Sequence, residues 1–246
     1  LLDEYLRNDP LSRVAIEAQG GHGVVNIVGE VTSKYEINEQ EAWIIANKVL
    51  EEYRMPKCSV TWTVVQQSPE ISEGVSTGGA GDSGIVVGYA TPDTPEMLPL
   101  ELAYARRIAA AFDSQSRLGK DGKIQVTQED GKITYVIASV QHQNPLQEAR
   151  REIEDIIRAT VGEHLSQRVT ILCNPAGSFH MGGFAADTGA TGRKIVQDQY
   201  GPQIPVGGGA FSGKDATKVD RSGAYYARWV AKTLCEKTGR PALVKF

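Results

Sequence analysis

Stretches rich in β-branched residues alternate with amphipathic helical stretches along most of this 246-residue chain. Residues 24–32 and 58–67 are rich in Val, Ile, Thr and Trp, a composition that favours strands. Between them, residues 39–53 carry apolar side chains at the spacing of an amphipathic helix. The further expected strands are 85–90, 123–128, 132–142 and 168–173, and the further expected helices are 100–112, 146–161 and 221–237.

This alternation predicts an α+β fold of repeated strand–helix–strand units, with helices packed on one face of mixed sheets. The dipeptide Asp130-Gly131 separates two expected strands and is a strong hairpin signal. We expect three consecutive parts: an N-terminal unit at 1–90, a middle unit at 91–170, and a nucleotide and phosphate-loop region at 171–246. The first and last residues read as interrupted elements, which predicts that the sequence is a piece of a longer protein.

Composition narrows the class of protein. With 41% hydrophobic and 23% charged residues, the chain has the make-up of a soluble globular protein. Its formal net charge of -4 gives no reason to expect nucleic acid or an anionic membrane as a partner. No apolar run is long enough for a membrane span. The three cysteines are scattered without metal-ligand spacing, which favours a reduced, cytoplasmic location.

The strongest local signal is the glycine-rich run at residues 207–220. Its glycines would let backbone N–H groups approach an anion, and the helix expected after it would present its positive end to phosphate. Lys214 and Lys218 are four positions apart and are expected on one helical face, while Asp220 could hold a magnesium ion. The alternative is a glycine-rich surface turn with solvated lysines.

This run nearly matches the P-loop pattern. Residues 208–214 satisfy G-x-x-x-x-G-K, but Asp215 stands where a Ser or Thr hydroxyl would contact magnesium. Residues 201–205 before it are also a poor buried strand. A P-loop enzyme is therefore disfavoured.

Two other glycine-rich segments are weaker signals. Residues 79–84 match G-x-G-x-x-G, but a strand follows where a dinucleotide fold needs a helix, so a turn that aims Asp82 into a site competes with a plain hairpin turn. Residues 187–194 place Arg193 and Lys194 beside glycines, which suits a second anion-binding loop or a solvated loop. Asp121-Gly122-Lys123 alone favours a simple turn.

The four histidines, His22, His142, His164 and His180, show no metal-ligand spacing, so each is interpreted as structural. No G-x-S-x-G nucleophile motif is present.

Together these loops resemble the methionine adenosyltransferase (S-adenosylmethionine synthetase) family. The segments that carry the resemblance are 65–69, 79–82, 121–127, 139–142, 187–194 and 207–222. They occur in the family's order, and the run from Gly207 to Ser222 is highly specific to it. The resemblance implies that methionine sulfur attacks C5′ of ATP, and that the triphosphate leaves and is hydrolysed to phosphate and pyrophosphate.

The resemblance also implies roles for individual residues. The phosphate-gripping cations, expected to be catalytic, are Lys123, Arg193, Lys194, Lys214 and Lys218. Ser68, Asp121 and Phe179 are expected to complete the ATP site, with Phe179 stacked on adenine. The methionine-side residues are Glu30, Gln67, Asp82, Asp187 and Lys218. Asp220 is expected to bind Mg²⁺ and Glu17 to bind K⁺. The pocket would lie between two subunits, in a homodimer or a dimer of dimers.

The sequence departs from the family at several places. The family's Gly-His-Pro-Asp segment would precede Leu1, and its C-terminal part would follow Phe246. Ser83, Ala176 and Ser178 replace residues usual in the family. Two alternatives therefore stand beside an active adenosyltransferase: a non-catalytic or regulatory subunit of such an enzyme, and a chain that only binds or hydrolyses polyphosphate.

Overall fold

The computed structural model describes residues 1–68, 82–114 and 117–246. Its contacts divide the chain into two compact units. The first unit consists of residues 1–92 together with 187–246, and the second consists of residues 93–186. Among the described residues, no helix is both long and apolar enough to cross a membrane.

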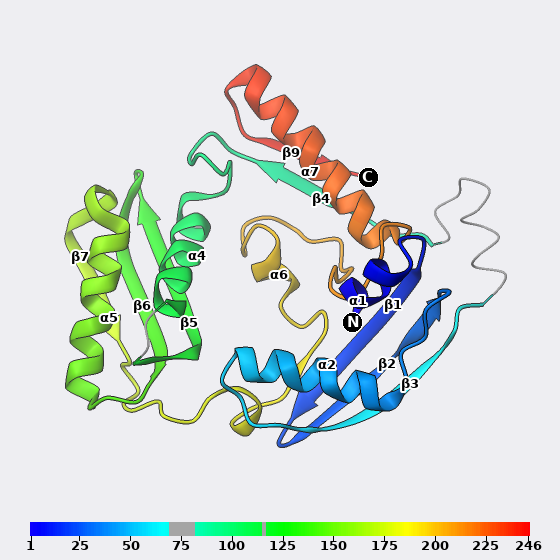
Figure 1. Ribbon diagram of the computed structural model, residues 1–246. Helices are drawn as coiled ribbons and strands as arrows, with labels where there is room; N and C mark the ends of the chain where they lie inside the picture. The colour runs from blue at the N-terminus through cyan, green and yellow to red at the C-terminus, as the bar shows by residue number, and fades with distance from the viewer. Residues whose placement is uncertain (69–81, 115–116) are drawn as a thin grey trace. The chain divides into compact units, whose positions relative to one another are not determined.

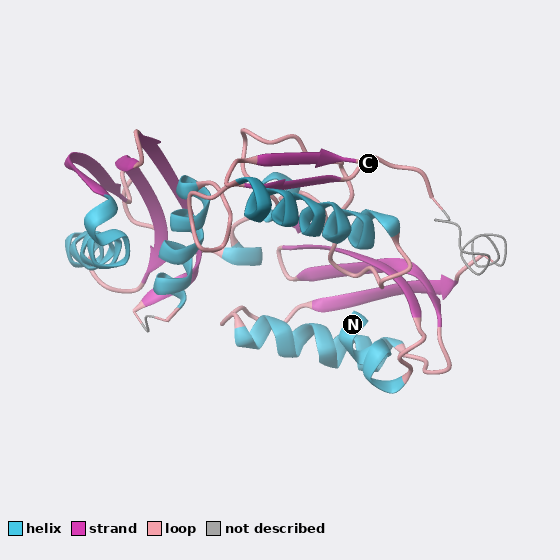
Figure 2. Cartoon of the chain, turned by 90° about the horizontal axis from the view of Figure 1, so that it is seen from above, coloured by secondary structure: helices cyan, strands magenta, loops and turns pink. Residues whose placement is uncertain are grey.

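The first unit is built around a mixed sheet with the strand order β3-β2-β1-β8. The chain starts with the short helix α1 (Leu2–Asn8) and then forms the antiparallel pair β1 (Arg13–Gly21) and β2 (Val24–Thr32). Helix α2 (Glu39–Glu52) leads to β3 (Ser59–Gln66), which is parallel to β2. The short strand β8 (Gly189–Ala190) pairs with the other edge of β1. Helix α2 lies on one face of this sheet (Figure 2).

The two faces of this sheet differ in exposure. Val14, Ile16, Val25 and Ile27 are buried, while the residues that alternate with them point to the opposite face. The start of α2 is held by a capping box, in which Asn38 and Glu41 bond each other's backbone N–H groups. The buried amide of Asn47 on this helix then bonds both backbone groups of Cys58, just before β3. These contacts fix the helix on the sheet.

The first unit also contains a small two-stranded sheet that packs against a long helix. Strands β4 (Val87–Ala90) and β9 (Ala242–Lys245) are antiparallel and lie beside helix α7 (Val219–Thr238), as Figure 1 shows. A β-carbon on Gly88 would lie 2.0 Å from the carbonyl oxygen of Ala227, so only glycine allows this approach. The helical turn α6 (Ile195–Asp198) lies between β8 and this helix in the sequence.

The second unit is a three-stranded sheet covered on one face by two helices. Its strand order is β5 (Leu118–Glu129), β6 (Lys132–His142) and β7 (Leu165–Cys173), with β5 and β6 antiparallel and β6 and β7 parallel. Helices α4 (Leu100–Asp113) and α5 (Leu146–Val161) contact each other and the sheet. The 3₁₀ turns η1 (Gly162–His164) and η2 (Gly183–Ala185) complete the unit.

The core of this unit is apolar and continuous. The fully buried members with the lowest exposure are Ile108, Ile133, Val136, Ala138, Ile153 and Ile157. They come from both helices and the central strand, so burial of their side chains is the main force that holds helices on sheet.

The predicted α+β class with mixed sheets is confirmed. Helix 146–161 and strands 24–32 and 132–142 have the bounds expected from the sequence. The units differ from the three consecutive parts predicted, because β8 pairs with β1 and α7 packs on β4, which joins residues 187–246 to the N-terminal residues. Gly79 and Gly81 of the G-x-G-x-x-G match lie outside the described residues.

Candidate functional site

Within the glycine-rich run at 207–220, residues 213–215 pair with the edge of β1 instead of starting a helix at Lys214. Lys214 forms an isolated antiparallel bridge with Ala15, and the Ile16 N–H donates to the Gly213 carbonyl at 3.0 Å. Helix α7 begins only at Val219, with Lys218 at its N-cap. The prediction that Lys214 and Lys218 share one helical face is therefore wrong, because backbone pairing with β1 extends the chain at Lys214.

Asp215 holds this run in place. Its side chain is almost fully buried, and its Oδ1 accepts hydrogen bonds from the Val14 N–H at 2.6 Å and from Lys218 Nζ at 3.0 Å. Oδ2 accepts from the Thr217 N–H at 2.8 Å. Burial alone would raise the pKa of this carboxyl, but the hydrogen bonds from Thr217, Val14 and Lys218 lower the pKa below its ordinary value. The residue that breaks the P-loop pattern is thus a structural tether.

Lys214 and Asp220 meet at the start of α7. The distance from Lys214 Nζ to Asp220 Oδ2 is 2.6 Å, and both side chains are mostly buried. A β-carbon on Gly209 would lie 2.4 Å from the Asp220 carboxyl carbon, so only glycine lets this carboxylate pack directly on the backbone of the run. Asp220 is in the first turn of α7, where the helix dipole favours a negative charge. A cation, a carboxylate and the glycine backbone that packs on it are therefore gathered at one helix end.

The second expected anion-binding loop adjoins the first. Thr191 exchanges hydrogen bonds with the backbone of Ala18 on β1, and a β-carbon on Gly192 would lie 3.3 Å from the Ala210 Cβ. Arg193 and Lys194 are exposed, and one Arg193 Nη donates to the Thr188 carbonyl at 2.8 Å. The structure thus brings together two glycine-rich loops that carry four of the predicted phosphate-gripping cations.

Apart from Lys218, the predicted methionine-side residues are spread over four segments of the first unit. Glu30 is exposed on β2, and Asp82 accepts a hydrogen bond from the Ser83 N–H. Gln67 follows β3 and is 7% exposed, and its side-chain oxygen has no hydrogen-bond partner among the described residues. Asp187 is exposed and accepts from the Thr188 N–H. Ser68, predicted for the ATP site, is half-buried next to Gln67.

In the second unit, Asp121 and Lys123 lie on β5. The Asp121 carboxylate accepts a hydrogen bond from the Gly183 N–H at 2.7 Å. A β-carbon on Gly182 would lie 2.8 Å from the Asp121 Cβ, so residues 182–183 pack tightly on this side chain. Lys123 is exposed two positions further along the strand, opposite Ser139 on β6. Asp121 therefore binds the segment at residues 182–183, whereas its local sequence favours only a simple turn.

Phe179 lies in an irregular segment between β7 and η2 and is half-buried. Its N–H donates to His142 Nε2 at 3.1 Å, and its carbonyl accepts from the His142 N–H at 2.9 Å. The start of the segment is held by Asn174, whose amide bonds both backbone groups of Val140. No local pattern predicted these hydrogen bonds, because each of them joins residues that are distant in the sequence.

Few of the described side chains are placed where they could bind a metal ion together. Within the described ranges, no group of three or more His, Cys, Asp or Glu side chains could hold a metal ion. Asp220 offers one carboxylate, which is compatible with Mg²⁺, because this ion is commonly bound by one or two carboxylates together with substrate phosphates. Glu17 offers a single exposed carboxylate on β1, so the residues around it do not by themselves form a potassium site.

Family models match most of this chain. Residues 77–179 match the central domain of S-adenosylmethionine synthetase, and residues 181–240 match its C-terminal domain. The S-adenosylmethionine synthase of Aquifex aeolicus is 40% identical over 94% of this chain and 67% of its own length. The chain belongs to the S-adenosylmethionine synthetase family. This confirms the family predicted from the loops at 187–194 and 207–222.

Other members of the S-adenosylmethionine synthetase family give the same result. The S-adenosylmethionine synthase of Paracoccus denitrificans is 42% identical over 95% of this chain and 67% of its own length. A solved structure described as an unusual S-adenosylmethionine synthetase from Campylobacter jejuni is 29% identical, with a TM-score of 0.88 over 99% of this chain and 70% of that one. The chain thus spans about two thirds of the length of these relatives.

Proposed function

We propose that this chain makes S-adenosylmethionine from ATP and methionine, as an ATP:L-methionine S-adenosyltransferase. The observation that carries this proposal is the meeting of the two cationic loops at Gly192 and Ala210, beside the Lys214–Asp220 pair. The relatives that bear the name S-adenosylmethionine synthase support it, since they align with nearly the whole chain.

The proposed reaction needs fixed positive charge. The methionine sulfur donates an electron pair to C5′ of ATP, the C5′–O bond breaks, and its electron pair leaves with the triphosphate. Negative charge therefore builds up on the leaving oxygen, where preorganised cations stabilise the transition state more than the ground state. The cations proposed for this role are Lys123, Arg193, Lys194, Lys214 and Lys218. Water then cleaves the triphosphate into phosphate and pyrophosphate.

Asp220 is proposed as a Mg²⁺ ligand. Its carboxylate lies in the first turn of α7 and keeps 26% of its side chain exposed, and a carboxylate is a ligand type that Mg²⁺ takes in nucleotide sites. When bound, Mg²⁺ neutralises charge on the phosphate oxygens. Lys214 Nζ lies 2.6 Å from Asp220 Oδ2, so we expect the Lys214–Asp220 pair to loosen when ATP and Mg²⁺ bind. Glu17 is proposed to supply one carboxylate to a K⁺ site. The other oxygen ligands of this site would come from groups other than the neighbours of Glu17.

The remaining proposed roles concern substrate recognition. Ser68, Asp121 and Phe179 are proposed to bind the nucleotide, with Phe179 stacked on adenine. Glu30, Gln67, Asp82, Asp187 and Lys218 are proposed to bind methionine. The buried Gln67 side-chain oxygen supports this, because an acceptor without a partner among the described residues is costly unless a ligand donor satisfies it. A methionine ammonium group is such a donor.

A homodimer, or a dimer of dimers, with the site between subunits is also proposed. Val28 and Val65 are 48% and 58% exposed on the same sheet face as Glu30. Exposed valines beside proposed site residues support a second copy of the chain as the cover of this face. A cytoplasmic location is proposed from the free thiols of Cys58, Cys173 and Cys235.

The test uses the full-length protein with ATP, methionine, Mg²⁺ and K⁺, and measures S-adenosylmethionine by mass spectrometry. We expect S-adenosylmethionine only when methionine is present, and the absence of this product would overturn the proposal. Phosphate release without methionine would identify a polyphosphate hydrolase instead. Product that forms only after addition of a second, active synthetase subunit would identify a non-catalytic partner.

A further inference from the structure

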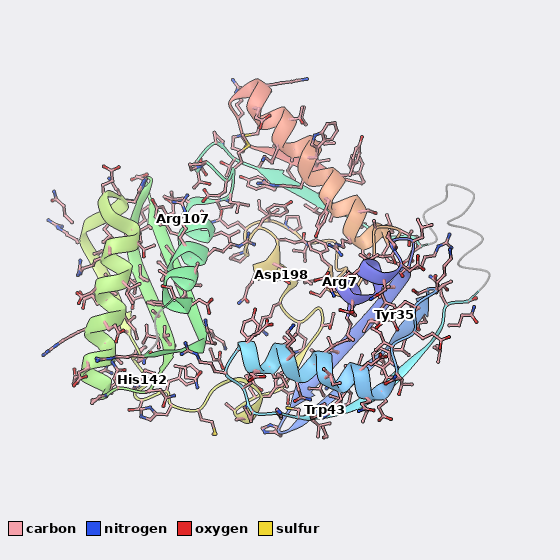
Figure 3. All side chains as sticks on the ribbon, viewed as in Figure 1. Arg7, Tyr35, Trp43, Arg107, His142 and Asp198 are labelled. Atoms are coloured by element: carbon pink, nitrogen blue, oxygen red, sulfur yellow. The ribbon has the colours of Figure 1, made fainter. Side chains whose placement is uncertain are left out.

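His142 is the last residue of β6 and is completely buried, as 0% of it is exposed. It continues the row of core-facing residues Val136, Ala138 and Val140, which alternate along the strand. Figure 3 shows its side chain at this end of the strand. A buried imidazole at the end of an apolar row needs hydrogen-bond partners for both ring nitrogens.

Both ring nitrogens of His142 have partners that fix its tautomer. Nδ1 lies 2.7 Å from the carbonyl oxygen of Asn144, which can only accept. Nε2 lies 3.1 Å from the backbone nitrogen of Phe179, which can only donate. These partners place a proton on Nδ1, which donates to the Asn144 carbonyl, and leave Nε2 as the acceptor of the Phe179 N–H.

The same residue also bonds Phe179 through its backbone. The His142 N–H donates to the Phe179 carbonyl at 2.9 Å, so one residue satisfies both backbone polar groups of Phe179. Next to it, His180 Nδ1 lies 2.9 Å from the His142 carbonyl, and the two rings pack with centroids 4.6 Å apart. Residues 174–182 have no helix or strand of their own, so these bonds largely determine where the Phe179 ring lies.

We propose that His142 is a positioning residue for the nucleotide, which sets the Phe179 ring for adenine through the Nε2 bond to the Phe179 N–H. The proposal rests on the proposed function, because it uses the adenine-stacking role of Phe179. A packing role alone would require only the volume and burial of the ring. A positioning role requires an acceptor at the Nε2 position.

Two substitutions separate these roles. In His142→Gln the side-chain amide oxygen reaches the position of Nε2 and can accept from the Phe179 N–H. In His142→Asn the shorter amide reaches only the position of Nδ1, so it can donate to the Asn144 carbonyl but leaves the Phe179 N–H without its acceptor. His22→Asn is the matched control, since His22 lies in the exposed β1–β2 turn at φ 51°, which Asn tolerates.

The experiment measures binding to the full-length protein by calorimetry, with a non-hydrolysable ATP analogue and with inorganic tripolyphosphate. We expect His142→Asn to bind the analogue roughly tenfold more weakly, with tripolyphosphate affinity unchanged, because only the adenine contact depends on Phe179. His142→Gln and His22→Asn are expected to stay within about twofold of the unsubstituted protein. Amide hydrogen exchange at Phe179 is expected to be faster in His142→Asn only.

Equal losses in the Gln and Asn variants, or a parallel loss of tripolyphosphate binding, would overturn the positioning role, as would an unchanged analogue affinity in His142→Asn. If His142→Asn does not fold, the test rests on His142→Gln. The proposal then requires that this variant keeps its affinity for the analogue and the slow amide exchange of Phe179, and a loss of either overturns it. Failure of the proposed function looks different: the unsubstituted protein would then bind the analogue but form no S-adenosylmethionine. An unsubstituted protein that binds no analogue overturns both.

Discussion

Lys214 Nζ and Asp220 Oδ2 lie 2.6 Å apart at the first turn of α7, so a proposed phosphate-gripping cation is paired with a proposed metal ligand. Lys214 comes from a segment bridged to β1, while Asp220 belongs to the helix. This pair joins the run at residues 213–215 to the first turn of α7.

The first prediction concerns Lys214. The change Lys214→Met removes a cation proposed to face the triphosphate and should lower the turnover number about hundredfold or more. The free energy of unfolding should fall by about 1–3 kcal/mol, because the Asp220 carboxylate loses its partner but keeps 26% of its side chain exposed to water. Steady-state kinetics and urea unfolding measure the two effects. Lys48→Met on the exposed side of α2 is the control, and a Lys214 variant as active as this control would contradict the prediction.

Asp215 provides the second prediction. Asp215→Asn removes the charge that pairs with Lys218 and one acceptor of the Val14 and Thr217 N–H groups, so we expect a loss of about 2–4 kcal/mol of unfolding free energy. The matched control is Asp130→Asn in the exposed hairpin turn, where φ is 49° and Asn is tolerated. Urea unfolding of both variants checks it. A loss no larger than that of the control would show that the tether is dispensable.

The same carboxyl predicts a pH dependence. Its pKa is lower in the folded chain than in the unfolded chain, so the unfolded state binds the proton first as the pH falls. The stabilisation is therefore fully present above the unfolded value of about 3.9 and is lost as the pH falls through the folded pKa. We expect the stability difference between the unsubstituted protein and Asp215→Asn to shrink below about pH 4. A difference that stays constant from pH 6 to about pH 3 would contradict this.

Gly213 and Gly131 form a matched pair for the third prediction, because their φ angles are 77° and 76°. A β-carbon on Gly213 would lie 1.9 Å from the Ile16 carbonyl oxygen, whereas one on Gly131 would meet open space. Gly131→Ala should cost about 1 kcal/mol from the backbone conformation alone. Gly213→Ala should cost about 3 kcal/mol, because it also pushes the run away from β1. Equal costs in thermal or urea unfolding would mean that the run does not need this close approach.

The fourth prediction concerns Cys173. Burial raises the pKa of this thiol to about 11, so very little thiolate is present near neutral pH. We expect iodoacetamide to modify Cys173 at least about a hundredfold more slowly at pH 8 in the folded protein than in urea. Peptide mass spectrometry over time measures the two rates. Similar rates would show that the thiol is not held in a desolvated environment.

The sequence predicted the elements whose side chains repeat regularly. Strand β6 and helix α5 have the expected bounds because their apolar residues alternate or recur at helical spacing. Strand β1 was not predicted, because its second half contains Ala18, Gly20 and Gly21, which favour no strand by themselves. Its place is fixed by pairing with β2, with β8 and with residues 213–215, which are distant in the sequence.

The candidate site likewise has a part that the sequence predicted and a part that it did not. Glycines and cations marked both proposed anion-binding loops in the sequence, because these residue types suit phosphate. The path of the chain at Lys214 was misjudged, because it depends on hydrogen bonds between Asp215 and Val14 that no local spacing reveals. The contact of His142 with Phe179 was also not predicted, because it joins residues 37 positions apart.

The most direct test of the central proposal is the stoichiometry of products formed by the full-length protein from ATP and methionine. S-adenosylmethionine, phosphate and pyrophosphate are measured together over time, with and without methionine. We predict that the three products accumulate in equal amounts and that all of them depend on methionine. Phosphate or pyrophosphate formed in the absence of S-adenosylmethionine would contradict the proposed adenosyl transfer.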